Sequence, residues 1–147
     1  MSFDVDVSSN GARSPLSRAR TAEVVRAVLR SEKIRSALVS ITFLDKRAMA
    51  QLNKTHLNHR GPTDVISFGF SRAAKTDPVV GDIYICPEVA RLNARASREL
   101  VRRELTRLIT HGTLHILGYD HPDEGRETSD MWRKQERLVS RLAASSR

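Results

Sequence analysis

The sequence predicts an α+β fold, in which a small mixed four-stranded sheet is packed with helices and a central helix carries closely spaced histidines. β-Branched and aromatic residues gather in four short segments, and amphipathic segments with helical spacing separate and follow them. Two of the five histidines recur four residues apart inside the most apolar of these helical segments. The 147 residues are enough for one core and hardly enough for two, so residues 1–147 are expected to form a single domain.

The expected elements follow from local patterns. Strands are predicted at 3–7, 37–44, 65–70 and 79–86. Helices are predicted at 15–31, 46–57, 87–96, 98–117 and 124–143. Ser14 before Pro15 is typical of an N-cap followed by the first helical position, and Asp45 can cap the second helix. The third and fourth strands can pair as a hairpin across residues 71–78.

Two of these helices carry side chains whose burial can be predicted. The helix at 98–117 has a broad apolar face that includes Leu100, so it should pack deep against the sheet with Arg107 on its other side. In the last helix, Met131 and Trp132 belong to an apolar stripe at helical spacing, which predicts core positions.

Composition limits the classes of protein. Lys and Arg outnumber Asp and Glu by 25 to 17, and the net charge of +8 favours polyanions such as nucleic acid, although genomic base composition can also raise arginine content. The single cysteine, Cys86, excludes an internal disulfide and fits a reducing cytosol. The sequence has no apolar run near the ~20 residues of a membrane span and no start typical of a signal peptide. A cytoplasmic protein without a membrane segment is therefore expected.

The stretch 111–121 reads HGTLHILGYDH. His111 and His115 are four residues apart, so a helix places both imidazoles on one face within reach of one ion. Gly118 stands where the helix can end, because glycine adopts the left-handed conformation without steric cost. The chain can then turn back so that His121 completes a three-histidine cup. Three protein nitrogens with one open position are typical of a catalytic zinc site rather than a structural one.

Metzincin peptidases share this histidine spacing, but they carry a glutamate directly after the first histidine as general base. Here that position is Gly112. The sequence therefore predicts a metzincin-like site without the catalytic glutamate, which argues against a peptidase.

Three segments carry a resemblance to a known family. The stretch 111–121 resembles the H-G-x-L-H-L-x-G-Y-D-H signature of the YbeY family of rRNA maturation endoribonucleases. Residues 62–68 resemble that family's P-T-D-V-L-S-F segment, and residues 81–86 resemble its G-D-I-x-I-C strand. Because the element order also agrees over nearly the whole chain, residues 1–147 are identified as one YbeY-like, metal-dependent endoribonuclease domain.

The resemblance implies a zinc-dependent, single-strand-specific endoribonuclease that acts in 16S rRNA 3′-end processing and in ribosome quality control. It implies one Zn²⁺ per chain on His111, His115 and His121. The implied partners are single-stranded RNA or rRNA and the small ribosomal subunit, with a ribosomal protein or a GTPase as a further candidate. Two alternatives stay open: a ribosome-assembly factor with a mainly structural zinc, and a metal hydrolase of a non-RNA substrate.

The catalytic groups other than the metal stay unknown at this stage. Zinc lowers the pKa of bound water to about 7, but the 2′-OH of the RNA could serve as nucleophile instead, and the product ends would distinguish the two. Family members often carry an arginine at the position that is Leu57 here. His59 and Arg60 in the following loop are the candidate phosphate contacts in its place.

Four further residues are candidates for lining the site or binding RNA. Asp64, Ser67 and Asp82 lie on strands expected beside the histidines, although the two aspartates could instead cap turns. Asp120 either orients a ligand imidazole or bonds the backbone of its own turn. Cys86 is expected to be a small buried hydrophobe rather than a fourth ligand.

Overall fold

The computed structural model describes residues 1–120 and 129–145, and its element order, β-α-β-α-β-β-α-α-α, matches the predicted order. The strands are β1 (Ser2–Asn10), β2 (Ser36–Leu44), β3 (Val65–Phe70) and β4 (Val79–Ile85). The helices are α1 (Arg18–Ser31), α2 (Lys46–Leu57), α3 (Pro87–Ser97), α4 (Val101–Ile116) and α5 (Asp130–Ser145). The described helices include none that is long and apolar enough to cross a membrane.

The four strands form one mixed sheet in the order β1-β2-β4-β3. β1, β2 and β4 are parallel, and β3 runs antiparallel to β4, with Ser67 opposite Ile83. The predicted hairpin across residues 71–78 is therefore confirmed, as is the α+β class with a small mixed sheet.

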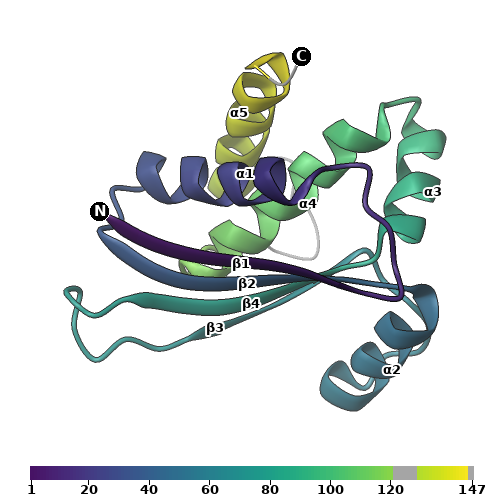
Figure 1. Ribbon diagram of the computed structural model, residues 1–147, viewed down its shortest axis with the longest axis horizontal. Helices are drawn as coiled ribbons and strands as arrows, with labels where there is room; N and C mark the ends of the chain where they lie inside the picture. Colours follow the sequence, from purple (N-terminus) through teal and green to yellow (C-terminus); the bar gives the residue numbers. More distant parts are fainter. Residues whose placement is uncertain (121–128, 146–147) are drawn as a thin grey trace.

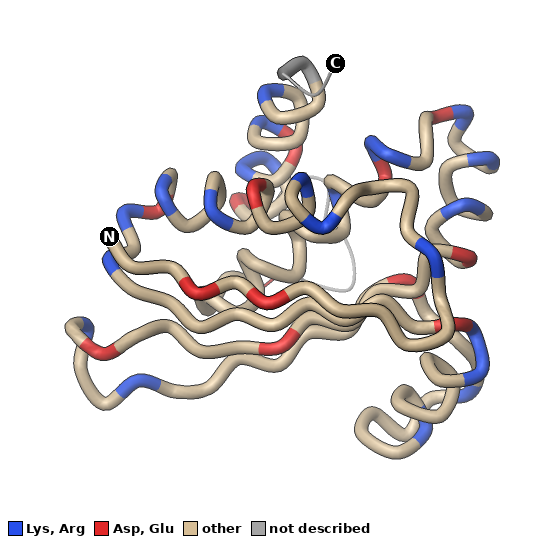
Figure 2. Tube along the Cα trace, viewed as in Figure 1, with Lys and Arg blue, Asp and Glu red and all other residues tan. Residues whose placement is uncertain are grey.

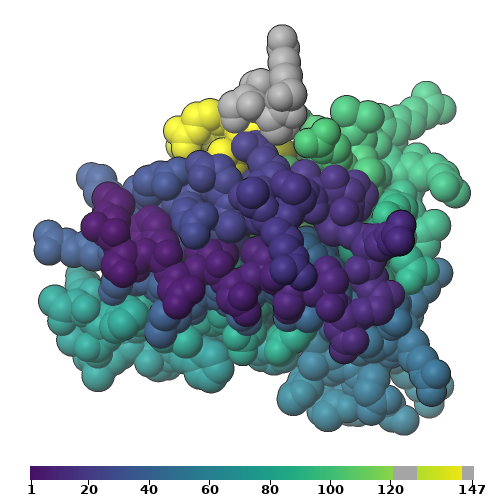
Figure 3. Space-filling view, in the orientation of Figure 1, coloured from purple at the N-terminus to yellow at the C-terminus, as the bar shows by residue number. Residues whose placement is uncertain are grey.

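One face of the sheet is covered by helices and the other is largely open. Helices α1, α4 and α5 lie over one face, whereas α2 stands beyond the opposite face at one end (Figure 1). In the space-filling view, β1 and α1 form a continuous surface and α2 protrudes at the lower right (Figure 3). Along β4, the buried residues Gly81, Ile83 and Ile85 alternate with Asp82 and Tyr84, which face the open side.

Helix α4 is the central helix, and it packs against α1, α3, α5, β3 and β4. Two glycines allow this close approach. A Cβ atom on Gly81 would lie 2.6 Å from Cδ1 of Ile116, and one on Gly112 would lie 3.0 Å from Cγ2 of Ile83. Gly112 therefore belongs to the interface between helix and sheet, and a side chain at the position that holds a glutamate in metzincins would press against Ile83 here.

The predicted start of the first helix is wrong. Helix α1 begins at Arg18, and the Ser17 hydroxyl accepts a hydrogen bond from the Arg20 N–H at 3.0 Å as the true N-cap. Ser14 accepts only from the Leu16 N–H, in a local turn. Leu16 is buried although it precedes the helix, so the chain reaches the core before the helix starts. By contrast, the predicted Asp45 cap of α2 is confirmed, because its carboxylate accepts from the Ala48 N–H at 2.8 Å.

The helix predicted at 98–117 starts later than expected. Arg98 adopts the left-handed conformation with φ 57° and ends α3, so α4 begins at Val101. Leu100 is the extended N-cap residue and is 77% exposed, not part of the apolar face. The first residues of the helix predicted at 124–143 lie outside the described residues. Within the described residues, α5 begins at Asp130.

The contact between Gly81 and Ile116 allows the close packing of α4 on the sheet to be tested. We expect Gly81→Ala to lower the free energy of unfolding by about 2 kcal/mol, because the added methyl overpacks this interface. Urea denaturation measures the loss. In the double variant with Ile116→Ala, which removes the three atoms that a methyl would meet, the loss should be smaller than the sum of the two single losses. Additive losses would contradict the close contact.

Candidate metal centre

His111 and His115 lie on the last two turns of α4 and face the same groove. Their ring centroids are 4.6 Å apart, and the rings stand at 71° to one another. The groove has a volume of about 350 Å³, and Leu57 and residues 63–67 form its other wall. The predicted third ligand, His121, lies outside the described residues. Among the residues that are described, no group of three His, Cys, Asp or Glu side chains is arranged to hold a metal ion.

Gln135 of α5 determines which nitrogen of His111 can meet an ion. Its Oε1 lies 2.6 Å from Nδ1 of His111, and its Nε2 donates to Oε2 of Glu136 at 3.0 Å. The second bond fixes the amide orientation, so Oε1 must be the acceptor and Nδ1 of His111 the donor. With Nδ1 as donor, Nε2 is the nitrogen through which His111 would ligate a metal, which is the arrangement typical of histidine ligands. The two imidazoles therefore fit a metal site.

The chain that leaves α4 is anchored at Tyr119 to the end of α1 and to α5. Gly118, with φ 101°, ends the helix, and the Tyr119 hydroxyl then donates to Glu32 at the end of α1. Lys134 of α5 donates to the Tyr119 oxygen at 2.6 Å and pairs with Glu32 at 3.0 Å. The hydrogen bonds with Tyr119 and Glu32 raise the pKa of Lys134. Asp120, a predicted site residue, is exposed directly after this anchor.

Two of the predicted site-lining residues do reach the groove. Asp64 and Ser67 line it together with His111 and His115. The Asp64 carboxylate accepts from the Val65 N–H at 2.8 Å and from the Asn93 amide at 3.0 Å, so it both caps the start of β3 and faces the groove.

Asp82 does not lie beside the histidines, and this expectation is wrong. Its neighbours Gly81 and Ile83 face α4, so strand alternation directs Asp82 to the open face of the sheet. There it accepts a hydrogen bond from the Ser40 hydroxyl at 2.6 Å. Figure 2 shows acidic residues along β1 and β4 on this sheet, while Lys and Arg gather on the helices.

The loop after α2 is arranged differently from the expectation. Leu57, at the family's arginine position, lines the groove and is 43% exposed. Arg60 instead lines a separate depression with Arg47 and Lys54, and His59 is exposed outside the groove. Neither candidate phosphate contact is among the residues that line the histidine groove.

A second cavity of about 690 Å³ adjoins the groove and shares His111, Asp64 and Val65 with it. Arg107 lies in its wall, only 15% exposed, rather than on a solvated face of α4 as expected. Its guanidinium pairs with Glu99 at 2.5 Å, Glu104 at 2.7 Å and Glu136 at 2.9 Å. This bonding lowers the pKa of Glu99, whereas burial raises the pKa of Glu104 despite the same partner.

Sequence reasoning missed three residues of this region. Arg107 and Gln135 are buried partners in hydrogen-bond networks, and Trp132 is half-buried in the cavity wall instead of being a core residue like Met131. The available signal was Gln135 itself, a polar residue at a position of the apolar stripe of α5. Cys86 is fully buried, and burial raises its thiol pKa, as expected of an unreactive packing residue.

The chain is similar to known proteins over most of its length. The family model described as Endoribonuclease YbeY matches residues 7–143. An Endoribonuclease YbeY from Frankia casuarinae is 37% identical over 92% of this chain and 73% of that protein. One from Beutenbergia cavernae is 40% identical over 86% of this chain and 91% of that protein. The solution structure of TM1509 from Thermotoga maritima superposes with a TM-score of 0.64 at 24% identity, over 95% of this chain and 89% of that one, which shows the shared fold.

These matches, together with the fold and the histidine groove, define an enzyme of the endoribonuclease class. More particularly, the chain belongs to the endoribonuclease YbeY family, as the resemblance predicts.

The Arg107 cluster predicts a pH-dependent stability. We expect Arg107→Met to lower the free energy of unfolding by about 2 kcal/mol at pH 7, because three carboxylates lose their cation. The low folded-state pKa of Glu99 stabilises the wild type above the unfolded pKa of about 4.3, and this contribution is lost as the pH falls. The gap between wild type and variant in urea denaturation should therefore be constant at neutral pH and narrow as the pH falls below about 4.3, toward the lower folded-state pKa of Glu99.

The matched control for this prediction is Arg103→Met. Arg103 is more exposed and lies 3.8 Å from Glu99, so its loss should cost under about 1 kcal/mol. A difference in free energy of unfolding between wild type and Arg107→Met that stays constant with pH would contradict the role of Arg107 in lowering the pKa of Glu99.

Proposed function

We propose that residues 1–147 form a zinc-dependent endoribonuclease domain that cuts single-stranded RNA in the cytoplasm. Its proposed roles are rRNA maturation, notably at the 3′ end of 16S rRNA, and ribosome quality control, with the small ribosomal subunit as partner and a ribosomal protein or GTPase as a further one. The observation that carries the proposal is the pair of imidazoles facing one groove, in a chain whose relatives are named endoribonucleases. The net charge of +8 supports a polyanionic substrate.

One zinc ion per chain would be held by His111, His115 and His121. When bound, zinc supplies Lewis acidity toward a phosphate oxygen or a water molecule. Gln135 keeps His111 in the tautomer that a ligand requires. Asp64 and Ser67 provide an acceptor and a hydroxyl on the facing wall of the groove, where the ribose hydroxyls of a bound strand would lie.

The histidine groove and two depressions that adjoin it support a path for a single RNA strand that extends beyond the groove at both ends. One contains Arg72 and the exposed ring of Phe70, and it shares His115 with the groove. The larger cavity adjoins the groove on the other side, at His111. A strand that enters beside Arg72 would thus pass both histidines before reaching α5.

The first test is cleavage of an end-labelled single-stranded RNA by the zinc-loaded protein. We expect His115→Ala to reduce cleavage at least roughly 100-fold, because the metal would lose one of three ligands. His56→Ala, which changes a histidine on α2 that contacts Phe68, should keep wild-type activity. Chelator treatment of the wild type should abolish cleavage.

The outcomes separate the competing functions. A 2′,3′-cyclic phosphate or a 3′ phosphate at the product end would indicate the 2′-OH as nucleophile, whereas a 3′-hydroxyl opposite a 5′ phosphate would indicate water. Cleavage that persists in His115→Ala would overturn the proposal. An assembly factor with a structural zinc would be favoured by two results together. The wild type would bind zinc but cut no RNA, and His115→Ala would unfold.

The role of Gln135 predicts a change in metal affinity. We expect Gln135→Met to weaken zinc binding roughly 10-fold, since an outer partner of a ligand histidine is lost. Competition with a chromophoric chelator measures this affinity, and ¹⁵N NMR should show His111 as a mixture of tautomers. Gln135→Glu keeps an acceptor for Nδ1 and should keep the wild-type tautomer. Gln51→Met, on the exposed side of α2, is the matched control. Unchanged affinity and tautomer in Gln135→Met would refute the role.

A further inference from the structure

The cavity beside His111 has features that the metal centre does not use. Its volume of about 690 Å³ lies within the range of roughly 300–1,000 Å³ that is typical of small-ligand sites. It is formed by α3, α4, α5 and the start of β3, and its apolar walls come from Trp132, Leu108 and Val65. Because it shares His111 with the groove, a group bound here would lie directly next to the histidine pair.

The charge of the cavity excludes phosphate. Four carboxylates line it, those of Asp64, Glu99, Glu104 and Glu136, against the single guanidinium of Arg107. That guanidinium already bonds three of them. A phosphate group would meet an excess of negative charge, whereas a neutral ring with N–H donors would meet hydrogen-bond acceptors.

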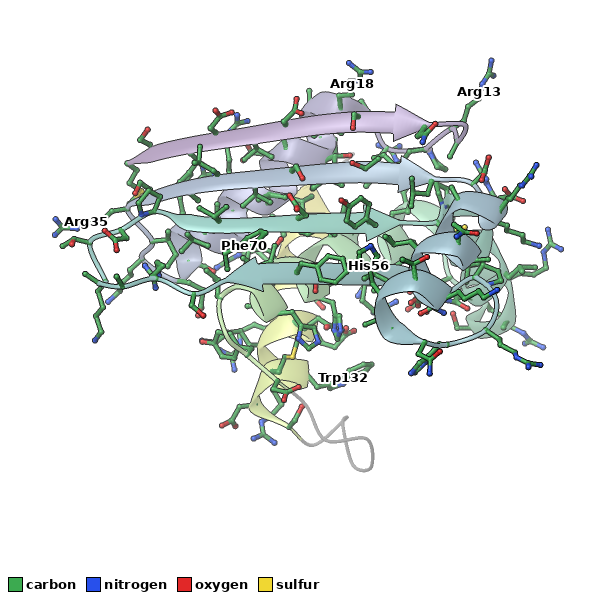
Figure 4. The ribbon with its side chains drawn as sticks, turned by 90° about the horizontal axis from the view of Figure 1, so that it is seen from below. Arg13, Arg18, Arg35, His56, Phe70 and Trp132 are labelled. Atoms are coloured by element: carbon green, nitrogen blue, oxygen red, sulfur yellow. The ribbon has the colours of Figure 1, made fainter. Side chains whose placement is uncertain are left out.

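Trp132 gives the cavity an aromatic wall. It is the single tryptophan of the chain, and it is half-buried in the wall of the cavity. In Figure 4 its side chain stands out from α5 rather than under the sheet. An aromatic ring at the edge of a polar cavity provides a stacking surface for a nucleobase.

We propose that this cavity binds one unpaired nucleobase with an exocyclic amino group, stacked on Trp132, in the nucleotide next to the scissile bond. The proposal rests on the proposed ribonuclease function and deepens it. The amino group donates to the carboxylates of the cavity, so cytosine, adenine or guanine fits, whereas uracil, which has no amino group, does not. A base in a duplex has its amino group paired and both faces stacked, so the cavity also supplies a physical reason for preferring single strands.

The binding test uses the fluorescence of the zinc-loaded protein, since all tryptophan emission comes from this wall. Cytidine 5′-monophosphate has no internucleotide bond to cut, and we expect it to quench the emission saturably. Uridine 5′-monophosphate should quench more weakly, and ribose 5-phosphate, which has no base, should not quench. Equal quenching by all three would overturn the proposal, because the phosphate would then be the group that binds.

The kinetic test uses a uridine octamer with one internal cytidine. We expect Trp132→Leu to raise KM roughly 10-fold and to remove the preference for cleavage beside the cytidine, whereas Trp132→Phe should keep most of both. Tyr84→Leu is the matched control, an aromatic replaced on the open face of the sheet. Wild-type KM and cleavage pattern in Trp132→Leu would overturn the proposal.

The two proposals fail separately. If the wild type cuts RNA but Trp132→Leu behaves like it, the base site is wrong and the ribonuclease function stands. If cytidine monophosphate quenches as expected but no RNA is cut, the base site stands and the ribonuclease proposal is wrong.

Discussion

The site depends on how closely α4 sits on the sheet. Gly81 and Gly112 remove side chains from both surfaces at the point of contact, so Ile116 and Ile83 fill the space that a Cβ would occupy. This close packing fixes the rotation of α4 about its own axis. The rotation directs His111 and His115 toward β3 and the groove rather than into the core. Interfaces packed this tightly respond to single methyl groups, because little free volume remains to absorb them.

Around this helix, polar side chains from distant segments form a continuous wall. Gln135 bonds both His111 and Glu136, and Glu136 in turn bonds Arg107. Each buried polar group in this series has a partner, which is the condition under which such groups rigidify a site instead of destabilising it. The wall therefore serves both the orientation of one imidazole and the acidic lining of the neighbouring cavity.

Local patterns in the sequence were enough for the element order, the hairpin and the placement of two histidines on one helix face. They were not enough for the orientation of residues that can face either side. Asp82 alternates with Gly81 and Ile83, and only the location of α4 decides that it lies away from the histidines. Likewise, Trp132 and Arg107 follow helical spacing, but their burial depends on the cavity that α3, α4 and α5 line together. The Ser14 cap failed because a second serine three residues later competes for the same role.

The anchor of Tyr119 makes the site depend on the docking of α5. Tyr119 bonds Glu32 near the beginning of the chain and Lys134 near its end, and α5 also supplies Gln135 and Trp132. The contacts of α4 with α1, α3, β3 and β4 do not involve α5. Until the last helix docks, the exit from α4 lacks its Lys134 contact and His111 lacks its Gln135 partner. The Tyr119 anchor and the Gln135 contact with His111 thus both require α5 to be docked on α4.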